Sequence, residues 1–139
     1  MTAEIELAGD IADLRKINKF YRQHGQYVSV NRDDVVVFYR SSERINAACM
    51  IRTLSLDNKE FLLLRSLFVE PKERKKGIAR SICLKLRASV DGDIYLVCAP
   101  NLITFYQSLG YKETNENELP KMMLQQIKKG QTLMVCPSN

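Results

Sequence analysis

The sequence predicts a mixed α/β fold, with antiparallel strands in its N-terminal half and a βαβα unit after them. Three runs rich in Val, Ile and Phe lie within residues 34–69 and are separated by short polar turns, which is typical of an antiparallel meander. An amphipathic pattern over 78–90 precedes a nearly continuous apolar run at 93–99, and another helical segment follows. A chain of 139 residues, 45% hydrophobic and 27% charged, has room for one core, so we expect a single domain over 1–139.

The N-terminal half begins with a short strand and a helix. Residues 4–8 alternate weakly between apolar and polar side chains, as a strand does. A helix over 10–24 follows, because its apolar residues recur on one face. Asp10 and Asp13 are placed to cap its first turn. The three expected strands of the meander are 34–40, 45–56 and 60–69.

Proline and glycine residues set the boundaries in the C-terminal half. Pro71 ends the third strand of the meander, because proline cannot continue a ladder of hydrogen bonds. The helix over 78–90 has apolar residues at spacing four and ends near Gly92. The apolar run over 93–99 is typical of a strand that is buried on both faces, and Pro100 ends this strand. The remaining expected elements are a helix over 101–109, a helix over 118–128 and a strand over 132–136.

The composition argues against several classes of protein. The sequence contains no run of eighteen or more uncharged apolar residues, so it predicts no transmembrane helix. The N-terminus lacks the basic, then apolar, then small residues of a signal peptide, so we expect a cytoplasmic protein without membrane contact. The formal charge of +5 is modest for a nucleic-acid binder. The cysteines are far apart, lie in apolar stretches and accompany a single histidine, so we expect core residues and no metal site. They are Cys49, Cys83, Cys98 and Cys136.

The stretch "VEPKERKKGIARS" (69–81) concentrates five basic residues around one glycine, directly before a helix. The first N–H groups of a helix have no intrahelical partners and the helix dipole is positive there, so an anion binds readily. Gly77 lets the backbone approach a phosphate, and Ala79 keeps the first helical turn narrow. The loop contains neither the dinucleotide fingerprint nor a P-loop. Taken alone, it is equally compatible with a solvated turn.

The wider pattern resembles the GNAT superfamily of acetyl-CoA-dependent N-acyltransferases. The pattern is V-x-P-x-x-R-x-x-G-x-A over 69–79, then a helix and a buried strand, then Asn101 and "FYQSLGYKE". The resemblance is specific over 61–113, and before that only the order of elements agrees. It implies a GNAT-like acyl-CoA N-acyltransferase fold, with acetyl-CoA as co-substrate and no metal.

The resemblance also assigns residues to the coenzyme. The backbone of Leu67, Phe68 and Val69 would pair with the pantetheine arm, and the basic loop would surround the diphosphate. Asn101 would face the pantetheine, although Asn is also a good helix N-cap. The residues implied in coenzyme binding are Leu67, Phe68, Val69, Arg74, Lys75, Lys76, Gly77, Ile78, Ala79, Arg80 and Asn101.

Two residues are candidates for proton transfer. The resemblance places Tyr106 near the thioester sulfur, where a phenol, with a pKa of about 10 in model compounds, suits protonation of a thiolate with a pKa of about 8.5. The alternative is that its ring packs in the core. Residues 61–69 contain no acid to act as base. Glu70 would reach an incoming ammonium through water or be a solvated charge, and His24 or Glu43 are alternative bases.

We therefore expect an enzyme that transfers the acetyl group of acetyl-CoA to a primary amine by direct attack. The alternative is a non-catalytic acetyl-CoA-binding module that regulates a partner protein, and the presence of Tyr106 favours the enzyme. The expected partner is a small-molecule or peptide amine, and the protein would be a monomer or homodimer. An acetyltransferase that acts on a nucleic acid is the less favoured alternative, because it would need basic residues well beyond the coenzyme loop. Position alone makes Tyr21, His24 and Tyr27 candidates to line the acceptor pocket.

Overall fold

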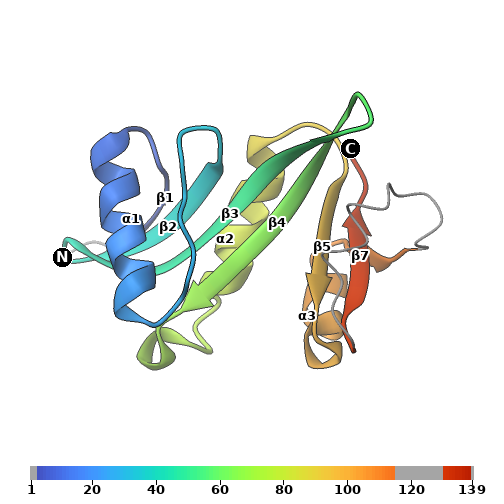
Figure 1. Ribbon diagram of the computed structural model, residues 1–139. Coiled ribbons are helices and arrows are strands. Elements are labelled where there is room, and N and C mark those ends of the chain that lie inside the picture. The colour runs from blue at the N-terminus through green and yellow to red at the C-terminus, as the bar shows by residue number, and fades with distance from the viewer. Residues whose placement is uncertain (1–2, 115–129, 139) are drawn as a thin grey trace. The chain divides into compact units, whose positions relative to one another are not determined.

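The computed structural model describes residues 3–114 and 130–138 (Figure 1). Its strands are β1 (Ala3–Leu7), β2 (Val35–Ser41), β3 (Arg44–Leu56), β4 (Lys59–Val69), β5 (Ile94–Cys98), β6 (Lys112–Glu113) and β7 (Thr132–Cys136). Its helices are α1 (Ile11–Gln23), α2 (Ile78–Ser89) and α3 (Ile103–Gln107), with 3-10 turns η1 (Pro71–Glu73) and η2 (Pro100–Leu102). Within these residues the strands form one mixed sheet in the order β1-β2-β3-β4-β5-β7-β6, which confirms the predicted fold class.

The chain divides into two compact units. The first contains Met1–Arg52 and Arg65–Val90, and the second contains Thr53–Leu64 and Asp91–Asn139. The strands β3 and β4 therefore contribute residues to both. The single domain expected from the sequence stays a prediction.

In the first unit, β1 pairs antiparallel with β2, and β2 pairs antiparallel with β3. Ser42 and Glu43 join β2 to β3, with φ angles of 53° and 68°. Positive φ at both central residues is what a type I′ hairpin turn requires, and this turn matches the twist of the strands it joins. The first two strands of the predicted meander are thus confirmed.

Two helices cover the sheet of the first unit. The helix α1 begins as predicted, because Asp10 Oδ1 accepts a hydrogen bond of 2.9 Å from the Asp13 amide. Its core cluster combines Ile17, Phe20 and Tyr21 with Val36, Phe38, Ala48 and Met50 of the strands. Successive strand residues point to opposite faces. The helix α2 packs against β2, and its Cys83 lies near Cys49, the residue between Ala48 and Met50 on β3.

In the second unit, β5 pairs in parallel with the beginning of β4, where Leu62 is opposite Ile94. This confirms the predicted crossover. The strand β7 pairs antiparallel with β5 and with β6. The short strand β6 was not predicted. The expected helix over 101–109 is a 3-10 turn followed by the shorter α3, and the expected helix over 118–128 lies outside the described residues.

All four cysteines are buried and carry free thiols, which confirms their prediction as core residues. Burial raises the pKa of the Cys83 thiol to about 12. It raises the pKa of Cys49 well above its ordinary value for the same reason. In the described part of the chain, no helix is both long and apolar enough to cross a membrane.

Candidate active site

The basic loop ends in a backbone conformation that suits an anion. Gly77 is the N-cap of α2 and has a left-handed conformation with φ of 79°, and Lys75 also has a positive φ, of 66°. Alternation of right- and left-handed residues turns successive N–H groups toward one point, where anions bind. Among the described residues no side chain caps α2, and its own first turn contains no acidic residue. Its first N–H groups and its positive dipole end are therefore open to an anionic ligand.

Side chains of this loop tie it to β4. Arg74 Nε donates to the Val69 carbonyl at 2.8 Å, and the guanidinium lies 5.5 Å from the centre of the Phe68 ring. Lys76 forms an ion pair of 3.2 Å with Glu73. Arg74 therefore fixes the loop against the end of β4, the segment for which the family resemblance predicts pairing with pantetheine.

The strand β4 is irregular at Ser66, just before Leu67. Ser66 has a φ of 63°, which is unusual for a residue other than glycine within a strand. The Tyr21 hydroxyl donates to the Ser66 carbonyl at 2.8 Å. Burial raises the pKa of Tyr21, so the phenol stays a donor. Tyr21 is fully buried, and its predicted place in the lining of an acceptor pocket is therefore wrong.

Sequence reasoning did not find Ser66. The only available signal was the polar Arg65-Ser66 pair, which interrupts the apolar run of β4. Such a pair gives no indication of a positive φ, because serine has no special preference for that conformation.

Glu70 lies at the centre of a polar cluster and is only 3% exposed. Its Oε1 lies 3.0 Å from Arg44 Nη2 and accepts a hydrogen bond from Asn46 Nδ2 at 3.2 Å. Its Oε2 lies 3.2 Å from Arg44 Nη2 and 4.0 Å from Lys72 Nζ. The Glu70 amide donates to the Asn46 carbonyl at 2.9 Å. The alternative of a solvated strand-end charge is thus wrong.

His24 joins this cluster from the C-terminal end of α1. Its Nε2 lies 3.7 Å from Glu70 Oε1. Its ring contacts those of Phe20 and Phe68, with centroid distances of 4.9 and 5.1 Å. Of the two alternative bases, His24 is beside Glu70, whereas Glu43 is exposed in the turn between β2 and β3.

The segment that follows His24 lines a pocket of about 520 Å³. Its lining residues are Arg22, Gly25, Gln26, Tyr27, Val28 and Ser29. The far end of the segment is held by Asn18, whose Oδ1 accepts from the Val30 amide at 2.8 Å and whose Nδ2 donates to the Val30 carbonyl at 3.2 Å. Tyr27 is fully exposed.

Two predicted site residues belong to the second unit. Tyr106 is the buried residue of α3, and its ring makes edge contacts with Phe105 and Tyr111 at centroid distances of 5.0 and 5.7 Å. Asn101 is exposed in η2. It caps neither element, because the N-cap residues are Ala99 and Leu102.

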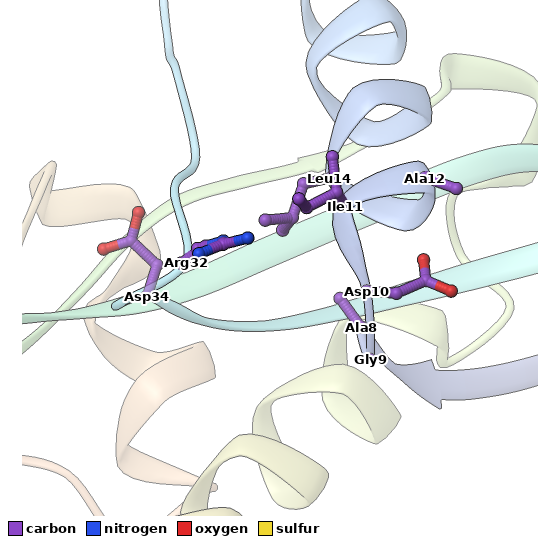
Figure 2. A pocket seen from close by; sticks show the side chains of 8 residues that line it. All are labelled: Ala8, Gly9, Asp10, Ile11, Ala12, Leu14, Arg32 and Asp34. Carbon is purple, nitrogen blue, oxygen red and sulfur yellow. The ribbon is translucent and has the colours of Figure 1, made fainter.

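A second pocket, of about 580 Å³, lies at the N-terminal end of α1 (Figure 2). Figure 2 shows the Arg32 side chain directed toward Ile11 and Leu14, with the Asp34 carboxylate pointing away from them. Arg52 holds that carboxylate through two hydrogen bonds of 2.9 and 2.8 Å. This pocket contains none of the predicted site residues.

The fold and the glycine loop at a helix N-terminus match a known class of protein. The model of the acetyltransferase (GNAT) domain matches residues 31–113, more than half of the chain. The chain therefore belongs to the GNAT acetyltransferase family, a family of acyl-CoA N-acyltransferases. No curated protein matches it.

Solved structures share this fold at low sequence identity. A GNAT acetyltransferase from Staphylococcus aureus Mu50 is 15% identical and has a TM-score of 0.67. The match covers 98% of this chain and 99% of that chain. Escherichia coli ElaA is also 15% identical, with a TM-score of 0.69 and coverages of 96% and 99%. N-acetylglutamate synthase from Neisseria gonorrhoeae, solved with coenzyme A and N-acetyl-glutamate, is 13% identical, with a TM-score of 0.64 and coverages of 100% and 36%.

Proposed function

We propose that this chain transfers the acetyl group of acetyl-CoA to a primary amine. One observation carries the proposal: the left-handed Gly77 precedes the first turn of α2, which has no acidic residue and which no side chain of the described residues caps, so an anion can approach it. A diphosphate fits this position because its charge meets both the helix dipole and oriented N–H groups. Membership of the GNAT family supplies the identity of the diphosphate ligand.

Each predicted coenzyme residue has a part in this proposal. The backbone N–H groups of Gly77, Ile78 and Ala79 would bind the diphosphate, with Lys75, Lys76 and Arg80 adding positive charge. Arg74 would hold the loop to β4, as its hydrogen bond to Val69 suggests. The backbone of Leu67, Phe68 and Val69, together with Asn101, would bind pantetheine.

The reaction would be direct attack of a neutral amine on the thioester carbon. The C–N bond forms and the C–S bond breaks, and the amine loses a proton while the coenzyme thiolate gains one. Holding the thioester along a strand would supply much of the rate gain through proximity, and a backbone N–H would stabilise the developing oxyanion. Tyr106 would donate the proton to the departing thiolate.

Glu70 would accept the proton of the incoming ammonium. Because Glu70 is 3% exposed, a substrate amine would reach its carboxylate through water or through His24, whose side chain is 23% exposed and lies 3.7 Å from Glu70 Oε1. The cluster supports such a path because it places a titratable imidazole against a fixed carboxylate.

Titration calorimetry with acetyl-CoA tests the coenzyme site, using Gly77→Gln and Gly77→Glu as a matched pair. A Cβ at Gly77 would meet no atom of the described residues within 4 Å, but the φ of +79° strains any side chain. Both variants share this strain and differ in one negative charge. We expect the wild type to bind, and Gly77→Glu to bind at least about tenfold more weakly than Gly77→Gln because its carboxylate faces the diphosphate.

Equal binding by the two variants would contradict a diphosphate at α2. If the wild type binds, release of the coenzyme thiol is then followed with a panel of amines, beside Tyr106→Phe. We expect turnover by the wild type and a lower kcat for Tyr106→Phe with unchanged coenzyme affinity. Binding of acetyl-CoA without turnover of any amine would instead support a regulatory acetyl-CoA-binding module.

A further inference from the structure

Two cations lie over the buried Glu70 and are open to solvent. The side chains of Arg44 and Lys72 are 59% and 60% exposed, whereas that of Glu70 is 3% exposed. Arg44 contacts both carboxylate oxygens through Nη2, and among the described residues its Nε and Nη1 donors have no partner, which leaves them for a ligand. A guanidinium with free donors is the preferred protein group for binding a carboxylate or phosphate.

The charge of this cluster is not balanced. In the described part of the chain, Glu70 is the only carboxylate in ion-pair contact with Arg44 or Lys72. The nearby acid Glu73 is paired with Lys76. One carboxylate therefore faces two permanent cations, and the cluster has a net charge of at least +1 even when His24 is neutral.

This surplus affects which amines can approach. Both oxygens of Glu70 are already occupied by Arg44, Asn46 and Lys72, so Glu70 offers little attraction to a second cation. A plain ammonium would be repelled by the cluster, whereas a molecule that also carries a negative charge would be attracted.

We propose that the acceptor is an amine that also carries an anionic group, a carboxylate or a phosphate, bound by Arg44 and Lys72. This inference rests on the proposed acetyl transfer. Arg44 and His24 lie at 3.0 and 3.7 Å from the same atom, Glu70 Oε1. Arg44, which would bind the anion, is thus close to His24 and Glu70, which would take the proton. This arrangement suits an acceptor molecule whose amino group and anionic group are only a few bonds apart, as in an amino acid.

The test uses amines in pairs that differ only in the anionic group. One arm compares amino acids with their carboxamides, and the other compares phosphoethanolamine with ethanolamine. The rate of thiol release gives kcat/KM for each amine. Within each pair, the kcat/KM of the anionic amine divided by that of its neutral counterpart measures recognition of the anion. We expect a ratio well above one in at least one arm, and the arm identifies carboxylate or phosphate as the group bound.

Charge variants locate the recognition. We expect Arg44→Gln to lower the ratio about tenfold and Lys72→Gln about threefold, because a charge-assisted contact to arginine outweighs an exposed lysine pair. Arg44→Lys keeps the charge and should retain most of the preference. Lys85→Gln, an equal loss of charge on α2, should leave the ratio unchanged.

The outcomes separate this inference from the proposed function. Turnover with ratios at or below one in both arms would overturn the inference while acetyl transfer stands. No turnover of any amine would overturn both. A coenzyme affinity that falls in Arg44→Gln and Lys72→Gln, with unchanged ratios, would assign these cations to coenzyme phosphates and also overturn the inference.

Discussion

At the residue scale, Glu70 shows how one carboxylate connects three elements. It follows directly after β4 and accepts hydrogen bonds from Arg44 and Asn46 at the start of β3. His24, at the end of α1, lies against the same carboxylate. A buried charge is tolerated only when it is paired and hydrogen-bonded, so these contacts account for a glutamate that is almost inaccessible to solvent.

Replacing Glu70 separates its chemical part from its structural one. Gln keeps an acceptor oxygen for Arg44 and Asn46, and the exposed Arg44 and Lys72 would rehydrate, so we expect a stability loss of only about 1–2 kcal/mol. Acetyl transfer should fall about tenfold or more, because an amide cannot accept the proton of the amine. Urea unfolding and thiol release measure the two effects.

The matched control is Glu60→Gln, at the exposed other end of β4, which should change neither quantity. Full activity in Glu70→Gln would exclude Glu70 as the base and leave it a structural residue.

At the element scale, α1 and β4 are joined by the hydrogen bond from Tyr21 to the Ser66 carbonyl. The bond holds the strand at its irregular residue, directly before the segment assigned to pantetheine. In an ordinary strand the N–H groups donate to, and the C=O groups accept from, the neighbouring strands, so a side-chain partner for the Ser66 carbonyl marks a local departure from the ladder.

Tyr21→Phe tests the importance of this bond. The substitution removes only the hydroxyl and leaves a carbonyl without its donor, which should lower the free energy of unfolding by about 1–2 kcal/mol. We expect weaker acetyl-CoA binding as well, because Ser66 precedes Leu67. Tyr27→Phe, at a fully exposed tyrosine, should alter neither property. A Tyr21→Phe protein as stable as the wild type would show that the bond contributes nothing.

The elements were predictable from sequence where local signals agree. The periodic pattern of α1 and its Asp10 cap, the apolar strands and Pro71 after β4 all point to one structure. Ser66 and the partners of Glu70 were not predictable, because they depend on contacts between distant segments, as the separation of 45 positions between Tyr21 and Ser66 illustrates. The length of α3 was overestimated because Leu102 reads as helical yet belongs to a 3-10 turn.

At the scale of the whole molecule, buried thiols connect stability to pH. Burial raises the pKa of the Cys83 thiol to about 12, and it raises the pKa of the Cys49 thiol well above its ordinary value. Above about pH 9 these thiols stay protonated in the folded state and ionise in the unfolded state. The unfolded state then binds fewer protons, so stability falls as pH rises.

We therefore expect the contribution of these thiols to the free energy of unfolding to be constant below pH 8. Above about pH 9, each should lower the free energy of unfolding by up to about 1.4 kcal/mol per pH unit. Urea unfolding in reductant from pH 7 to 10.5 measures the slope. Cys83→Ala should reduce the slope whatever its effect on stability at pH 7, and an unchanged slope would contradict the assignment.

The segment between His24 and Val30 has a further consequence for how this protein can diversify. Its beginning is fixed by the hydrogen bond from the Gln26 amide to the Tyr21 carbonyl, and its end by the two hydrogen bonds of Asn18 to Val30. Both anchors belong to α1. Between these anchors, Val28 packs against the core cluster and the Ser29 carbonyl accepts a hydrogen bond of 2.8 Å from Arg52 Nη2, whereas Tyr27 is fully exposed. Position 27 can therefore be exchanged, so that natural variation or directed evolution can alter the lining of the pocket while the glycine loop and its helix keep their structure.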